Sequence, residues 1–325
     1  MQKKEQMAEI IRCGKDPSYF CINYARISHP QRGLIPFNLY DFQKDVLLDF
    51  SKHRFNVILK ARQLGISTTV AAYVCWLLLF HRDKNVLVVA TKLQTATNSV
   101  KKIKAIHKNL PNWLKIASIS IDNRTSFELT NGSQVKASST SGDAGRSEAL
   151  SLLVVDEAAF VDGMEELWAG LYPTLSTGGG CIALSTPNGV GNWFHKTYTE
   201  AEENKNNFHT IQLPWEVHPE RDQDWFVKET KNMSRREIAQ ELECNFNASG
   251  ETVVHGDDLA KILEYITEPV RQTGFDRNYW IWQEPQKDKE YIVVADVARG
   301  DGSDFSVAHV FDTETMNQVA EYQGK

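Results

Sequence analysis

Short apolar runs alternate with longer patterns of helical period along much of the chain. Runs rich in β-prone residues lie at 57–59, 86–90 and 152–155, and each is typical of a buried strand. Between the strands, the segments 67–79 and 92–110 have a helical pattern, and the first carries a clear apolar face. Strands that alternate with helices are typical of a parallel sheet flanked by helices, so the pattern predicts an α/β fold.

The first run leads into the segment around which the chain is organised, residues 56–69. A strand is followed there by a loop at 60–65 and then by a helix that begins near Ser67. This order brings backbone N–H groups and the positive end of the helix dipole together, where they bind phosphate. The usual phosphate loop reads G-x-x-x-x-G-K-[ST], whereas this chain has Lys60 at the first position and Ile66 at the usual lysine position.

We interpret the loop as a variant in which the phosphate-binding lysine has moved to the front. The long, flexible stem of Lys60 would let its ammonium group arch back over the phosphates. The hydroxyl of Ser67 then occupies the place of a Mg²⁺ ligand. Taken alone, the same stretch also fits an ordinary turn between a strand and a helix.

Two adjacent carboxylates, Asp156 and Glu157, follow the apolar run at 152–155. In an open α/β sheet, ligands bind at the carboxyl ends of the strands. Asp156 is therefore a candidate for holding Mg²⁺ through its water shell, and Glu157 for orienting and deprotonating an attacking water. Without the upstream loop, the pair would indicate only a strand that ends in two solvated acids.

Two further polar features accompany this pattern. Gln43 precedes the loop by a distance suited to an adenine contact, and its amide both donates and accepts; a surface glutamine on a helix is the alternative. The run at 179–185 predicts another strand, which ends at Ser185 and Thr186. Their hydroxyls would respond to the γ-phosphate, although a plain junction between a strand and a turn fits them as well.

The composition limits the kinds of partner that the protein can bind and the cellular compartment in which it works. The formal net charge is −6 and the pI is about 5.9, so DNA binding would depend on local basic patches. The lysines at 101–108 form either such a patch or a solvated helix face. The five cysteines are scattered without a C-x-x-C pair, which favours a reducing compartment. The start lacks the apolar core of a signal peptide, and the apolar run at 70–80 is too short to span a bilayer, so we expect no membrane association.

The last part of the chain predicts a second group of strands. A polar segment at 278–289 indicates a boundary. After it, residues 291–311 are typical of a strand, a glycine-rich turn and a second strand, and 318–322 is a third candidate. Asp296 lies inside the first of these strands, where a carboxylate is costly unless it binds a metal, and Asp304 opens the second.

Together these motifs resemble those of the large terminase subunit of tailed bacteriophages, the motor that pumps DNA into an empty capsid. The resemblance extends from about Leu39 to Phe311 and rests on separate stretches in the family's order. These stretches are 40–43 for the adenine motif, 60–68 for a phosphate loop with its lysine first, 154–157 for the Mg²⁺ and catalytic-glutamate motif, 185–189 for the coupling motif, 241–250 for a late part of the ATPase region, and 295–300 with Asp304 for the start of an RNase H-like nuclease.

The resemblance implies a role for each matched residue. Glu157 is the implied catalytic base. An arginine stabilises the transition state in such motors, and the candidates are Arg62 in the loop and Arg146 ahead of the acid strand. The residues implied to bind ATP are Gln43, Lys60, Ala61, Arg62, Gln63, Leu64, Gly65, Ile66, Ser67 and Thr68.

The same resemblance implies the coupling residues and the metal ligands. Ser185, Thr186 and Pro187 would couple hydrolysis to movement. The implied metal ligands are Ser67 and Asp156 for Mg²⁺ at the ATP site, and Asp296 and Asp304 for Mg²⁺ or Mn²⁺ at the nuclease site.

The family's organisation implies a P-loop ATPase of the ASCE type, a small subdomain and then an RNase H-like segment. The expected divisions are 1–38 for a helical lead-in, 39–215 for the ATPase core, 216–289 for the subdomain and linker, and 290–325 for an incomplete nuclease. The family's nuclease needs further acids downstream of Asp304, and the sequence stops before them. Two carboxylates are poor support for two-metal cleavage, so we expect little nuclease activity.

The expected function is ATP-driven translocation of double-stranded viral DNA into a preformed capsid, with a nuclease that would cut concatemeric DNA. The implied partners are double-stranded DNA, the portal protein, the small terminase subunit and further copies of the chain in a ring. The implied location is the cytoplasm of an infected bacterial host. Two alternatives stay open: another DNA-dependent ATPase such as a helicase, and an ATP-binding assembly scaffold that does not hydrolyse.

Overall fold

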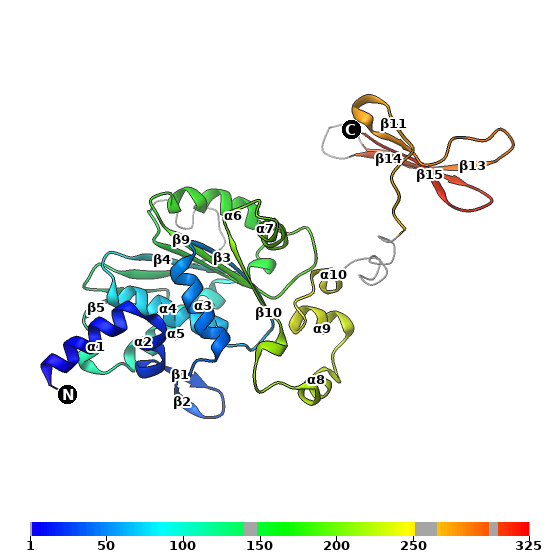
Figure 1. Cartoon of the computed structure of the whole chain (residues 1–325). Helices are drawn as coiled ribbons and strands as arrows, with labels where there is room; N and C mark the ends of the chain where they lie inside the picture. The colour runs from blue at the N-terminus through cyan, green and yellow to red at the C-terminus, as the bar shows by residue number, and fades with distance from the viewer. Residues whose placement is uncertain (1, 140–147, 251–264, 299–304, 325) are drawn as a thin grey trace. The chain divides into compact units, whose positions relative to one another are not determined.

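The computed structural model describes residues 2–139, 148–250, 265–298 and 305–324. The chain divides into two compact units, Met1–Gly256 and Asp257–Lys325. Each unit is built around its own main β-sheet (Figure 1).

The first unit contains an eight-stranded sheet in which the six strands from β10 to β7 run parallel. The strands β6 and β5 extend it as an antiparallel edge. This arrangement confirms the predicted parallel α/β fold. Across the sheet the strands are β10 (His209–Leu213), β3 (Phe55–Lys60), β9 (Gly180–Ser185), β8 (Leu152–Asp156), β4 (Asn85–Ala90), β7 (Gln134–Ser138), β6 (Ser126–Leu129) and β5 (Ile119–Asp122); β1 (Arg26–His29) and β2 (Gly33–Pro36) form a separate hairpin.

Helices cover both faces of this sheet. The helices α3, α4 and α5 pack on one face, and α6 and α7 lie on the other (Figure 1). Within the described residues, no helix combines the length and the apolar character needed to cross a bilayer. The helices are α1 (Lys3–Lys15), α2 (Pro17–Tyr24), α3 (Asp41–Lys52), α4 (Ile66–Phe80), α5 (Leu93–Lys108), α6 (Met164–Leu171), α7 (Trp193–Glu202), α8 (Gln223–Thr230), α9 (Arg235–Glu241) and α10 (Phe246–Ser249).

The central strands are buried on both faces, which explains why they are continuous apolar runs rather than alternating ones. Every residue of β8 is buried, and in β3 only the terminal Lys60 is partly accessible. The helix α4 is also buried on most of its circumference, because α1 and α2 cover the side that faces away from the sheet. Its Trp76 Nε1 donates to the carbonyl of Cys13 at 2.7 Å, and its Phe80 ring packs edge-on against Phe20. A helix predicted to have one apolar face is therefore a central core helix.

A hairpin forms between β6 and β7. In its turn Gly132 has positive φ, at +84°, whereas Asn131 does not. Asn131 instead donates its side-chain amide to the carbonyls of Leu78 and His81 at 2.9 and 3.1 Å. These bonds attach the turn to the C-terminal end of α4 and set its shape.

The second unit contains a five-stranded antiparallel sheet. The three strands predicted from 291 onward are present, and two more precede them. In order across the sheet the strands are β11 (Arg271–Thr273), β12 (Tyr279–Ile281), β15 (Gln318–Gly324), β14 (Ser306–Asp312) and β13 (Tyr291–Asp296).

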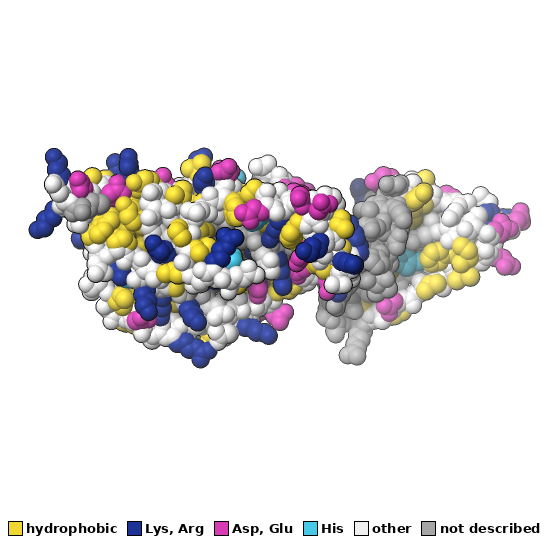
Figure 2. Space-filling view, turned by 90° about the horizontal axis from the view of Figure 1, so that it is seen from below, with side chains coloured by type: hydrophobic (Ala, Val, Ile, Leu, Met, Phe, Trp, Pro, Cys, Tyr) yellow, Lys and Arg dark blue, Asp and Glu magenta, His cyan; other side chains and the backbone are white. Residues whose placement is uncertain are grey.

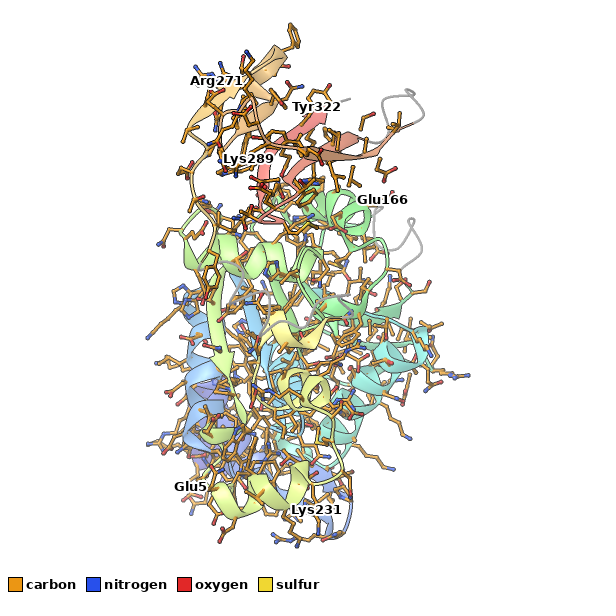
Figure 3. The ribbon with its side chains drawn as sticks, turned by 90° about the vertical axis from the view of Figure 1, so that its right-hand side faces the viewer. Glu5, Glu166, Lys231, Arg271, Lys289 and Tyr322 are labelled. Atoms are coloured by element: carbon orange, nitrogen blue, oxygen red, sulfur yellow. The ribbon has the colours of Figure 1, made fainter. Side chains whose placement is uncertain are left out.

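The first residues of the segment predicted as a linker at 278–289 form β12 and belong to this sheet. The reason is non-local pairing: β12 lies against β15 with Tyr279 opposite Tyr322. Lys289, at the end of the same segment, holds the buried carboxylate of Asp312 at 2.6 Å. Figure 3 labels Lys289 and Tyr322 among the side chains of this unit. The wider four-part division of the chain stays a prediction.

Candidate nucleotide-binding site

The site lies where four neighbouring parallel strands end. Parallel pairing in register places Leu59 beside Ser185, Leu184 beside Asp156, and Asp156 beside Ala90. The residues at or just after these strand ends therefore share one edge of the sheet. The register thus brings the predicted loop, the predicted acid pair and the predicted coupling segment together from three distant parts of the sequence.

The loop between β3 and α4 presents a row of free backbone donors. Gly65 is the N-cap of α4 in a left-handed conformation with φ of +75°, and Gln63 also has positive φ at +57°. Within the described part of the chain, the backbone N–H groups of residues 63–67 donate to no protein acceptor. Consecutive free N–H groups at the start of a helix form an anion site, so the loop fits a phosphate group.

The predicted ATP-binding residues of the loop are divided between the core and the surface. Ala61, Leu64 and Ile66 are buried, Lys60, Ser67 and Thr68 are half-buried, and Arg62, Gln63 and Gly65 are exposed. Ile66 is only 1% exposed and belongs to the core cluster. A lysine at position 66 would therefore point into the core, which gives a physical reason for the lysine's place at the end of β3.

Gln43 on α3 is hydrogen-bonded to the loop. Its side-chain Nε2 donates to the carbonyl of Leu64 at 2.9 Å, and its Oε1 accepts from the N–H of Tyr40 at 3.1 Å. The residue is 3% exposed, so it is not the surface glutamine that was one interpretation. A side chain added at Gly65 would lie 2.8 Å from Gln43 Nε2, so the glycine is needed for this contact as well as for its φ. The adenine contact of Gln43 stays a prediction.

Lys60 and Asp156 are opposite charges in a poorly solvated place. Burial lowers the pKa of Lys60, while Asp156 and Glu157 raise it. Burial likewise raises the pKa of Asp156, and Lys60 opposes this. The hydroxyl of Ser67 lies 3.4 Å from Asp156 Oδ1. The predicted pair of Mg²⁺ ligands is therefore adjacent, with a cation next to it that reduces the cost of burying the carboxylate.

Glu157 is held in an uncommon backbone conformation with φ of +58° and ψ of 41°. Such a conformation costs a non-glycine residue about 1–2 kcal/mol. Its N–H donates to Asp156 Oδ1 at 3.1 Å, and its Oε2 accepts from the hydroxyl of Thr91 at 3.1 Å. Thr91 directly follows β4, so it orients the carboxylate from the adjacent strand.

The outer side of the loop is held by the segment that contains α8 and α9. The N–H of Arg62 donates to the carbonyl of Glu241 at 2.7 Å, and the guanidinium of Arg62 forms an ion pair with the Glu241 carboxylate. Arg221 donates to the carbonyls of Arg62 and Gln63 at 3.2 and 3.0 Å, and its guanidinium stacks over the Trp225 ring. These bonds keep two loop carbonyls turned outward, away from an anion.

The predicted coupling residues lie at the end of β9 and are buried. The hydroxyl of Ser185 accepts from the N–H of Ala159, two residues after Glu157, at 3.1 Å. Asn188 donates to the carbonyl of Ala159 at 3.2 Å, and the N–H of Gly189 donates to the Ser249 hydroxyl at 3.0 Å. The segment after β9 therefore connects the turn at Glu157 to α10. Thr186 and Pro187 lie within this buried segment.

The structure does not place three of the predicted residues, Arg146, Asp296 and Asp304, in a site. Arg146 and Asp304 fall outside the described residues. Asp296 is described. It is the last residue of β13, and its side chain is exposed rather than buried. The burial cost that suggested a metal at Asp296 is therefore absent, because the side chains of β13 after Tyr291 are exposed on both faces of the strand.

Sequence reasoning missed three residues of the site: Thr91, Arg221 and Glu241. Thr91 had a signal, because it directly follows the predicted strand at 86–90 and so belongs to the same sheet edge. Glu241 begins the stretch that resembled a late part of the family's ATPase region, but nothing in the sequence tied it to the loop. Arg221 had no signal, because it reaches the loop only through the packing of a segment more than 150 residues away.

The topology and the loop geometry define an α/β protein with a P-loop-like fold. The sequence profile described as "Terminase large subunit, T4likevirus-type, N-terminal" matches residues 57–261, which is more than half of the chain. The chain belongs to this family of terminase large subunits.

Solved structures of other phage large terminases share the fold. The Thermus phage P74-26 large terminase ATPase domain has 19% sequence identity and a TM-score of 0.53, with 65% of this chain and 94% of that one covered. The large terminase of bacteriophage HK97 has 14% identity and a TM-score of 0.58, with 95% and 67% covered. A further large terminase, from a bacteriophage described as thermophilic, has 13% identity and a TM-score of 0.54, with 89% and 69% covered.

We expect Thr91→Val to lower ATP turnover about tenfold with little change in nucleotide affinity. The substitution keeps the volume but removes the hydroxyl that orients Glu157, and a tenfold effect corresponds to about 1.4 kcal/mol in the barrier. Steady-state ATPase assays and nucleotide titration measure the two effects. Thr97→Val is the matched control, because its hydroxyl donates to the Leu93 carbonyl within α5. Equal turnover in both variants and the parent would contradict the role of Thr91.

Proposed function

We propose that the chain hydrolyses ATP and uses the energy to move double-stranded DNA into a viral capsid. The observation that carries this proposal is the meeting of the free N–H row at 63–67 with Lys60, Ser67, Asp156 and Glu157 at one sheet edge. Family membership supports the same conclusion, because terminase large subunits are DNA-packaging proteins. The large terminase of the thermophilic bacteriophage has been solved in complex with ADP and with ATP-γ-S, which supports ATP as the nucleotide here.

The residues present fit a nucleotide with a divalent cation. The N–H row and Lys60 would hold the phosphates, and Ser67 with Asp156 would hold Mg²⁺, which neutralises phosphate charge when bound. Of the two acids, Glu157 is the one that is partly solvated and hydrogen-bonded to an adjacent strand. It is therefore the base that takes a proton from the attacking water.

The candidates for the transition-state arginine have different environments. Arg62 is on the loop itself, but Glu241 holds its guanidinium on the outer side. We propose that this ion pair opens when the phosphates compete for Arg62, which would loosen the attachment of α9 to the loop. Arg146 remains a second candidate from sequence, for an adjacent subunit's site. In enzymes where it has been dissected, an arginine finger raises the rate of hydrolysis by about 10³–10⁵. We expect an effect of this size from whichever of the two arginines acts here.

The coupling proposal rests on the contacts after β9. Ser185 and Asn188 bond both the N–H and the carbonyl of Ala159, and Gly189 bonds Ser249. A shift of the turn at Glu157 would therefore be transmitted through buried hydrogen bonds to α10. We propose that Thr186 and Pro187 keep this segment stiff enough for such transmission.

The proposed partners are double-stranded DNA, the portal protein, the small terminase subunit and other copies of the chain in a ring, in the cytoplasm of an infected bacterium. On the face shown in Figure 2, Lys and Arg side chains of the first unit are spread among acidic ones rather than gathered in one continuous patch. The lysines of α5 are the local basic group that sequence suggested for DNA. Several subunits would combine such local groups around one duplex.

A nuclease role for the second unit is a separate proposal. It rests on the resemblance of the stretch at 295–300 and on Asp296 and Asp304, and the family would use Mg²⁺ or Mn²⁺ there.

We expect Glu157→Gln to keep ATP binding and to reduce turnover by about 10²–10⁴, the usual worth of a general base. Asp156→Asn should weaken Mg²⁺-dependent binding instead, because it removes the charge next to Ser67. Nucleotide titration with and without Mg²⁺, together with single-turnover hydrolysis, separates the two. Unchanged turnover in Glu157→Gln would remove Glu157 as the base.

Lys60→Ala should reduce hydrolysis by at least about 10²-fold, because it removes the cation aimed at the phosphates. Ile66→Val is the matched control: it trims a buried side chain at the usual lysine position and should cost only packing, about 0.5–1.5 kcal/mol of stability. ATPase assays and urea unfolding measure the effects. Normal hydrolysis by Lys60→Ala would mean that the loop is a plain turn between strand and helix.

Movement of DNA is tested with the purified chain, portal-bearing procapsids and a linear duplex that carries a bound third strand. We expect ATP-dependent displacement of the third strand without separation of the duplex, and loss of displacement in Glu157→Gln. Separation of the duplex strands would favour a helicase. ATP binding without hydrolysis, with portal and DNA present, would favour an assembly scaffold.

A further inference from the structure

Two histidines and an aspartate meet at the opposite end of β3 from the nucleotide site. Asp49 and His53 lie one turn apart at the end of α3, so their side chains project from the same helix face. The N–H of His53 donates to the carbonyl of Asp49 at 2.8 Å, which fixes this last turn. His209 is the first residue of β10, and parallel pairing places it beside Asn56 at the start of β3.

The three side chains are close enough to share an ion. His209 Nε2 lies 3.4 Å from Asp49 Oδ2, and the His53 and His209 rings stack at 3.8 Å with a 10° interplanar angle. One ligand atom from each residue lies within 4.8 Å of the other two. Ligand atoms around a tetrahedral Zn²⁺ with bonds of about 2.0–2.1 Å are about 3.3 Å apart. The Asp49–His209 pair already has this spacing. An imidazole nitrogen binds a metal in the plane of its ring, so the His53 ring would have to turn out of the stack before its nitrogen could face the same ion.

The cluster is partly open to solvent and lies beside a buried polar atom that lacks a partner. Asp49 and His209 are half-buried, with side-chain exposures of 24% and 34%. Asn56, the register partner of His209, is 1% exposed, and within the described structure its Oδ1 has no hydrogen-bond partner. His53 and Asn56 also line a cavity of about 380 Å³. A buried oxygen without a partner beside the cluster indicates that something polar belongs there.

We propose that Asp49, His53 and His209 form a structural site for Zn²⁺ or a similar divalent transition metal. Two imidazole nitrogens and one carboxylate oxygen are ligands that Zn²⁺ accepts, and water completes the coordination. The ion would fasten β10 to the end of α3. This matters for β10 because, among the described strands, it lies at the edge of the eight-stranded sheet and pairs only with β3.

The test is Zn²⁺ titration of the full chain in competition with a chelator. We expect one saturable Zn²⁺ per chain and a rise in the melting temperature of the first unit. His209→Gln and Asp49→Asn should each weaken binding at least tenfold while ATP turnover is retained. His29→Gln is the matched control, since it removes a half-buried imidazole from β1, outside the cluster. The described cysteines are all buried, which keeps thiols from competing.

Two further measurements do not depend on the folding of the variants that remove a ligand. Co²⁺ bound to the unmodified chain should give the visible absorption of a tetrahedral site with nitrogen and oxygen ligands. Asp49→His should retain Zn²⁺ binding, because it replaces one ligand with another. Absence of saturable binding by the unmodified chain, or binding that His209→Gln leaves unchanged, would overturn the site and leave a stacked histidine pair with a neighbouring carboxylate.

Discussion

Parallel pairing in register between β3, β9, β8 and β4 is the constraint on which the rest of the first unit depends. Each of these strands arises from a different part of the sequence, and only aligned pairing makes their ends coincide. A shift of one residue in β8 would turn Asp156 to the other face of the sheet and expose apolar residues that are now buried. Burial of both sheet faces therefore specifies the position of the chemistry as well as the stability of the fold.

The loop at the end of β3 is held from several sides by contacts that leave its donors free. Gln43 bonds the carbonyl of Leu64 from α3, and Arg221 bonds the carbonyls of Arg62 and Gln63 from the segment before α8. With these carbonyls engaged, the N–H groups of 63–67 have no nearby loop acceptor to turn toward. Such an arrangement is a prepared anion site, in which little rearrangement is needed when a phosphate enters.

The opposite charges of Lys60 and Asp156 reduce the cost of burying both side chains at the site. An isolated buried carboxylate or ammonium is strongly disfavoured, and the opposite pKa shifts of Asp156 and Lys60 show that burial acts on both. Each is kept near the other by the register of the sheet, so the pair tolerates burial better than either alone. The same pair leaves positive charge toward the phosphates and negative charge toward a cation, which is the polarity that a bound nucleotide requires.

Local sequence patterns were enough to predict the central strands β3, β4, β8 and β9, the loop between β3 and α4, and the acid pair at the end of β8. A strand end, a glycine with positive φ and a helix start are each encoded within a few adjacent residues. Lys60, Ser67, Asp156 and Glu157 could therefore be assigned to one sheet edge from the order of the elements. The pairing of Arg62 with Glu241, the use of the Gln43 amide on the loop, the place of β12 beside β15, and the meeting of His209 with Asp49 followed only from the folded chain. Those contacts join residues far apart in sequence, and their geometry depends on packing and strand register, which no local pattern encodes.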